Sequence, residues 1–299
     1  MVTADDFGIG EATSWGIVDA VRAGAVDRIS VMVVTGEHLL RSLSALDAIP
    51  RPPVGLHLTL CSNAGRPLTA TRAGGFVRRD GGFVNLRTLW LRGWLGRLDR
   101  HALEDEILAQ VDRFRSLLGH PPAHLDGHQH AHELPGVAET VTELLRQRRL
   151  PPRLRCTAPP DSPHRWHGSA SLHARRALIH HLGRRARPLF RAADAQLTDG
   201  FLGIIAPPPH PPPPAPPYPS PDLTATTRPA PATASPWAAE LASVQSLPGV
   251  YEMMVHPGRA DPTLQGRDPY VQPRVNELQW LLALGPAVSG RAPPPQASP

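Results

Sequence analysis

The sequence lacks lysine, so all 31 of its basic residues are arginines. It has only two cysteines, Cys61 and Cys156, which excludes a disulfide framework or a CxxC motif. No run approaches the ~18 consecutive apolar residues of a membrane-spanning helix, and residues 1–6 lack the features of a signal peptide. We therefore expect a cytoplasmic protein with no stable insertion in a membrane.

The absence of lysine also limits what the charge implies. With 26 acidic residues the formal net charge is +5, but exclusive use of arginine beside a surplus of alanine and proline is typical of GC-rich codon usage. We therefore predict no nucleic-acid partner. The arginine cluster between Arg175 and Arg191 could bind phosphate or anionic lipid, although a solvated helix face explains it better.

The 299 residues are enough for one or two domains, and α/β barrels reach this length as one. Apolar runs predict buried strands, and helical periodicity with Gly24 and Gly119 as C-caps predicts helices. The strands are 29–34, 54–60 and 250–256, and the helices are 12–23, 101–118 and 137–148. Strands that alternate with helices favour a mostly parallel sheet, in a barrel or a doubly wound fold.

Proline interrupts this pattern, since 14 of the 30 residues from 207 to 236 are proline. Such a tract predicts polyproline II or disorder. A PxxP ligand is the alternative, but an unconstrained insertion explains it better. We expect a single domain over residues 1–288 that this insertion interrupts, and a similar disordered tail over 289–299.

Polar residues follow the predicted strands. Asp5 and Asp6 end a short strand, and both reach one site only if the backbone turns there; otherwise they are helix caps. His57 alternates with Leu56 and Leu58, so it would point into a barrel, with a buried structural histidine as the alternative.

The densest cluster lies between residues 124 and 132. Alternation in an extended segment predicts one shared face for five polar side chains: His124, Asp126, His128, His130 and His132. Imidazoles are common metal ligands, and Asp126 could be a ligand itself or orient a ligating histidine. A histidine-rich surface loop is the alternative.

A fourth cluster joins Glu252 and His256 on one face of a strand that Pro257 and Gly258 end. A structural turn explains it nearly as well when taken alone. Together, four polar clusters at the carboxyl ends of parallel strands are typical of an active site in α/β proteins.

These motifs, in their order ADDFG, GLHLTL, PPAHLDGHQHAHELPG and YEMMVHPG, resemble those of the YdjC-like carbohydrate deacetylases. That family includes chitooligosaccharide deacetylases and hopanoid-biosynthesis-associated members. The resemblance spans residues 1 to about 205 and 237–262. It implies an α/β fold, an irregular (β/α) TIM-like barrel, and hydrolysis of the acetamido group of an N-acetylated amino sugar or oligosaccharide, with release of acetate.

The resemblance also implies roles for residues. Asp6, His57 and His128 would bind one divalent metal, Asp5 would be the general base, and His256 the general acid. We further expect the substrate to contact three residues, Glu252, His130 and Asp126.

The ligand types favour Zn, Co or Fe, whereas the family admits Mg, so Mg or Zn is expected, with Mn and Co as further options. A homodimer is compatible with the sequence. Two other functions remain open: another barrel metallohydrolase, such as a phosphoesterase, and a sugar-binding descendant without catalysis.

Overall fold

The fold is described from a computed structural model. It covers residues 1–47, 49–62, 65–69, 74–160, 169–204, 236–244, 246–268 and 270–287. Apart from Pro236, the predicted proline-rich insertion lies outside these residues, as does the predicted tail. The assignment of residues 1–288 to one domain therefore stays a prediction.

The described strands form one parallel sheet in the order β4-β3-β2-β1-β6-β5. The strands are β1 (Val2–Phe7), β2 (Arg28–Val31), β3 (Val54–Leu58), β4 (Leu125–Gly127), β5 (Gly200–Leu202) and β6 (Tyr251–Val255). β1 is central, because Ala4 pairs with Ile29 of β2 on one side and with Val255 of β6 on the other. All of β1 is buried, as expected of a parallel strand covered on both faces.

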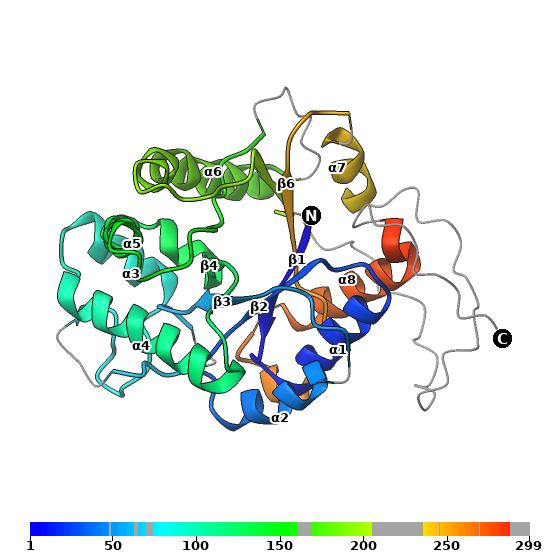
Figure 1. The fold of residues 1–299 in the computed structure, drawn as a ribbon, viewed down its shortest axis with the longest axis horizontal. Coiled ribbons are helices and arrows are strands. Elements are labelled where there is room, and N and C mark those ends of the chain that lie inside the picture. Colours follow the sequence, from blue (N-terminus) through cyan, green and yellow to red (C-terminus); the bar gives the residue numbers. More distant parts are fainter. Residues whose placement is uncertain are drawn as a thin grey trace.

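Helices surround this sheet (Figure 1). They are α1 (Glu11–Arg22), α2 (Glu37–Asp47), α3 (Leu86–Trp94), α4 (Arg100–Leu118), α5 (Val137–Arg146), α6 (Ala170–Arg191), α7 (Pro236–Val244) and α8 (Val271–Leu284), with short 3-10 segments at His128–Glu133, Pro262–Leu264 and Gly285–Ala287. α1 packs against α2 and α8, and α5 packs against α4 and α6. The predicted end of α4 is confirmed: Gly119 is left-handed at φ 76° and its amide donates to the Arg115 carbonyl.

The sheet curls, and a segment without regular structure continues it beyond β4. Leu154 forms a parallel bridge with Leu125, and Arg153 forms one with Gln196. The amide of Phe201 in β5 donates to the carbonyl of Ala158, so residues 153–158 bond to both β4 and β5. This arrangement confirms the α/β class and is compatible with an irregular TIM-like barrel.

Two predicted strands are shorter than their apolar runs. β2 ends at Val31 although the run continues to residue 34, and β3 ends at Leu58. The ladder between β1 and β2 becomes irregular between Ala4 and Phe7, and beyond Val31 the Met32 amide still donates to the Phe7 carbonyl.

Within the described residues, no helix is long and apolar enough to span a bilayer.

Candidate metal and catalytic site

The carboxyl end of β1 brings Asp5 and Asp6 to one cavity. Asp6 has a left-handed backbone at φ 67°, in the irregular stretch of the ladder. A side chain that would otherwise point to the opposite face is thereby turned toward the same site. The required turn thus lies at Asp6 itself, and the two buried carboxylates both line the cavity.

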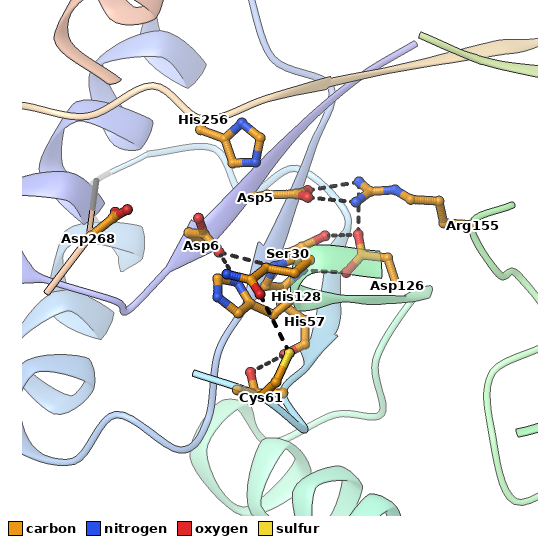
Figure 2. Close-up of polar contacts among 12 residues, drawn as sticks. Asp5, Asp6, Ser30, His57, Cys61, Asp126, His128, Arg155, His256 and Asp268 are labelled. Atoms are coloured by element: carbon orange, nitrogen blue, oxygen red, sulfur yellow. Dashed lines mark hydrogen bonds and ion pairs between the residues drawn. The ribbon is translucent and has the colours of Figure 1, made fainter. Parts of the chain in front are cut away.

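Asp6 meets two histidines from neighbouring parts of the sheet. Its Oδ1 lies 3.1 Å from His57 Nε2 and 2.8 Å from His128 Nδ1. One ligand atom from each of these three residues lies within 4.8 Å of the others. The structure therefore brings together the three residues that the family resemblance implies as metal ligands (Figure 2).

Two buried residues, Asp126 and Ser30, orient His57 from the side of its ring that faces away from Asp6. His57 Nδ1 lies 2.7 Å from Asp126 Oδ1, and Ser30 Oγ donates to Asp126 Oδ2 over 2.6 Å. A carboxylate on one ring nitrogen leaves the other nitrogen of His57 facing Asp6. Burial lowers the pKa of His57, but Asp126 and Asp5 outweigh it and raise this pKa to about 10.

Arg274 of α8 fixes the second oxygen of Asp6. Its guanidinium donates to Asp6 Oδ2 over 2.6 Å and also to Asp268. Although burial raises the pKa of Asp6, Arg274 and His128 hold it well below its usual range. Asp6 therefore stays an anion, as a metal ligand must.

Arg155 joins the carboxylates behind the site. It binds both oxygens of Asp5, at 2.6 and 2.8 Å, and also contacts Asp126 at 2.9 Å and Glu252 at 2.8 Å. Burial lowers the pKa of Arg155, but these carboxylates raise it well above its usual range. Burial raises the pKa of Asp5, and the Arg155 guanidinium opposes this rise.

The predicted face of five polar residues does not exist as one face. β4 ends at Gly127, and Gln129 and His130 are left-handed at φ 53° and 58°. The chain winds into a 3-10 segment, so the period of two is lost after Gly127. The extended register over residues 124–132 is therefore wrong.

The remaining members of this cluster point to different partners. His124 Nε2 lies 3.0 Å from Ser30 Oγ, and His132 Nε2 lies 3.1 Å from the Arg155 carbonyl. Burial lowers the pKa of both imidazoles to about 4. These two histidines are neutral and structural, and neither lines the cavity.

The three expected substrate contacts are placed differently from one another. His130 lines the cavity, with its ring centroid 5.4 Å from that of Phe201, and burial holds its pKa well below the usual range. Asp126 and Glu252 do not line the cavity and are bonded to Arg155 instead. The geometry therefore does not support substrate contact by Asp126 or Glu252.

His256 lies across the cavity from the two clustered histidines, on the far side of Asp5 and Asp6 in Figure 2. Glu277 of α8 accepts a hydrogen bond from the His256 amide, and its Oε2 is 3.9 Å from His256 Nδ1. Tyr270 donates to the same carboxylate over 2.8 Å and presents its ring edge-on to the imidazole. Glu277 thus fixes the backbone of His256 at the cavity, and Tyr270 packs against its ring.

The cavity has a volume of about 560 Å³ and joins these polar groups to an apolar wall. The wall comes mainly from α3, α6 and the strand ends: Leu86, Trp90, Leu134, Leu182, Ile204 and Met254. Arg87 and Arg175 lie at its exposed margin.

Three buried site residues escape the sequence-based prediction: Arg155, Arg274 and Glu277. Arg155 stands between Leu154 and Cys156, but Arg153 and Thr157 flank these two residues, so the local sequence gives no clear signal of a buried charge. Arg274 and Glu277 lie one turn apart on a helix with no motif of its own, so only the tertiary fold reveals them.

The sequence model of a family described as "YdjC-like protein" matches residues 1–285 of the chain. The chain belongs to the YdjC-like family. This match contains both the Asp5-Asp6 pair and the histidine-rich segment, so the residues gathered at the cavity are part of the family's common region.

Two curated relatives and one solved structure extend the comparison. Proteins named chitooligosaccharide deacetylase from Yersinia pestis (strain Pestoides F) and Yersinia pseudotuberculosis serotype O:1b are each 35% identical over 159 residues. Each match covers 52% of this chain and 58% of the relative, so it spans little more than half of either.

The solved structure is that of a protein from Enterococcus faecalis V583 with a proposed role in cellobiose-phosphate cleavage. It is 21% identical, has a TM-score of 0.66, and the alignment covers 97% of this chain and 92% of that one. At this identity the likeness concerns the fold. The two proteins therefore share a fold.

Proposed function

We propose that this protein is a metal-dependent carbohydrate deacetylase, which hydrolyses the linear amide of an N-acetylated amino sugar or oligosaccharide and releases acetate. The observation that carries this proposal is the Asp6, His57 and His128 cluster at a cavity that also holds Asp5 and His256. The names of the Yersinia relatives support the substrate class.

The donor set fits one divalent cation. One carboxylate and two imidazoles leave positions open for water and substrate, as a catalytic centre needs. Asp126 and Arg274 orient two of the donors, which matches the buried partners that metal ligands usually have. Such an ion, Mg or Zn, with Mn or Co as further options, supplies a Lewis acid that polarises the carbonyl and makes water more acidic.

The protein's own residues would then move the protons. Water adds to the carbonyl carbon, and Asp5 accepts the proton that this water gives up. When the C–N bond breaks, His256 protonates the leaving nitrogen, which gives acetate and a free amine. Arg155 fixes the plane of Asp5 through both oxygens, and Glu277 holds His256 at the cavity.

Paired substitutions of the two aspartates test this proposal. Asp6→Asn should lose the bound metal, because an amide is a weaker ligand than a carboxylate. Asp5→Asn should keep the metal and lose turnover by about 100- to 10,000-fold, because an amide accepts no proton from water. Metal content by mass spectrometry and acetate release from N-acetylated chitooligosaccharides are measured on the same preparations.

Asp105→Asn, at an exposed position on α4, is the matched control and should behave as wild type. If both Asn variants retain full acetate release, the catalytic assignment is wrong. Metal binding with no acetate release by the wild type, but with turnover of phosphate esters, would favour the phosphoesterase alternative. Sugar binding without turnover of either substrate would favour a non-catalytic descendant.

A further inference from the structure

Three large apolar side chains are exposed at the carboxyl end of α3, two on the helix and one on Leu95, the residue that caps it. Leu91, Trp94 and Leu95 have 59%, 57% and 53% of their surface exposed. Residues three and four apart lie on the same face of a helix, so these side chains form a continuous strip. Soluble proteins usually expose such residues singly, and no described part of the chain covers this strip.

The charge around the strip has one sign. Segment 81–98 contains three arginines and no acidic residue. Arg87 lies one turn before Leu91 on the same helix, and Arg97 follows the strip; both are exposed. The flanking acids are engaged elsewhere, because Asp80 is paired with an arginine and Asp99 caps α4.

α3 also forms one margin of the cavity. Leu86 and Trp90 of α3 line the cavity wall, and Arg175 and Leu178 of α6 lie at its exposed margin. α3 and α6 both lie at the left of the molecule in Figure 1, away from α8. The apolar strip is therefore next to the opening through which a substrate would reach the cavity.

We propose that the α3 strip, Leu91, Trp94 and Leu95, docks on the surface of a lipid bilayer with anionic headgroups. Tryptophan and leucine insert at the boundary between headgroups and acyl chains, and the arginines pair with anionic lipid. A second copy of this chain fits less well, because a symmetric contact would set the α3 arginines against themselves. Docking of this kind needs no spanning helix and does not depend on the proposed deacetylase activity.

Vesicle flotation with the full chain tests the proposal. The protein should float with vesicles of phosphatidylcholine and phosphatidylglycerol, much less with phosphatidylcholine alone, and less as salt increases. Trp94→Ala should weaken binding to the mixed vesicles about tenfold. Arg97→Gln should weaken it about fivefold.

Leu40→Ala is the matched control, since Leu40 is 53% exposed on α2, and it should bind as wild type. Unchanged thermal melting shows that each variant is folded. The proposal is overturned if the wild type does not float, or if Trp94→Ala floats equally well. It is also overturned if sedimentation without lipid shows a dimer that Trp94→Ala dissociates, because the strip would then be a protein interface.

Discussion

Arg155 binds the carboxylates of three residues from three different strands: Asp5 of β1, Asp126 of β4 and Glu252 of β6. All four side chains are buried. Water cannot compensate these charges, so Asp5 and Glu252 depend on the guanidinium, whereas Asp126 also bonds to His57 and Ser30. The bidentate bond to Asp5 also needs the planar fork that lysine lacks.

Removing this guanidinium should strongly destabilise the protein. We expect Arg155→Met to lower the free energy of unfolding by about 3–5 kcal/mol, because three buried carboxylates lose their contact with a buried cation. Arg155→Lys should lie between this variant and the wild type. Urea denaturation measures all three, with Arg113→Met on the exposed face of α4 as a control that should change little. Equal stability of Arg155→Met and wild type would contradict the role given to Arg155.

Glu133 is a buried carboxyl outside the cavity, with a different dependence on pH. It accepts hydrogen bonds from the amide and the hydroxyl of Thr157, and that hydroxyl also lies 3.0 Å from the Ile179 carbonyl. A hydroxyl has one proton, so it cannot donate to both acceptors at once. Burial raises the pKa of Glu133 to about 7, against the effect of these bonds.

Protonated Glu133 can donate to the Thr157 hydroxyl, which then donates to Ile179. The pKa of Glu133 in the folded state lies above its ordinary value, so the unfolded state gives up this proton at a lower pH than the folded state does. The free energy of unfolding therefore falls as pH rises from about 4.5 to about 7, in total by an amount on the order of 3 kcal/mol. Glu133→Gln keeps a donor and an acceptor and should remove this loss. Urea denaturation at about pH 5 and about pH 8 should therefore show a larger gain for the variant at the higher pH. An equal gain in the free energy of unfolding at both pH values would contradict this interpretation of Glu133.

At the scale of elements, the packing of α6 depends on the absence of a side chain. A Cβ atom on Gly183 would lie 2.3 Å from the Ala158 amide nitrogen and 2.4 Å from the Thr157 carbonyl carbon. Both neighbours are backbone atoms of the segment that connects β4 with β5, so they cannot rotate away. α6 lies close to this segment because residue 183 is glycine.

We expect Gly183→Ala to destabilise the protein by about 1–3 kcal/mol. The intrinsic preference of a helix for alanine, about 1 kcal/mol, opposes this effect but does not remove the steric conflict. Arg184→Ala, at the adjacent exposed position, should change the free energy of unfolding by less than about 0.5 kcal/mol. Thermal melting of the two variants side by side measures the difference. A stabilised Gly183→Ala would show that α6 can shift freely.

Helices and strands whose apolar residues recur with a regular spacing could be predicted from the sequence, and those without such a spacing could not. The helices near residues 12–23 and 101–118 show apolar stripes with glycine beyond their ends, and the structure contains α1 and α4 there. The extended segment predicted over residues 124–132 is too long, because an alternating sequence pattern does not reveal left-handed residues such as His130. β5 has three residues, too few to show a period.

At the scale of the whole molecule, parallel strands explain why the candidate site could be anticipated. The carboxyl ends of β1, β3, β4 and β6 lie at one edge of the sheet, so residues far apart in the sequence converge there. The contribution of α8 could not be anticipated in this way. Arg274 and Glu277 reach Asp6 and His256 from a helix outside the sheet, and only the packing of α8 on α1 places them.

The bond between Asp6 and Arg274 spans 268 residues of chain. On a ribosome that adds about 5–20 residues per second, roughly 13–54 s separate the synthesis of these two partners. For most of that interval β1 lacks β6 along one side, because Tyr251–Val255 is synthesised shortly before Arg274, and its two carboxylates are without the guanidinium groups of Arg155 and Arg274 for part or all of the time. The nascent amino-terminal half therefore presents an unpaired strand edge with exposed anions, and a chaperone that covers this edge would act before the cavity exists.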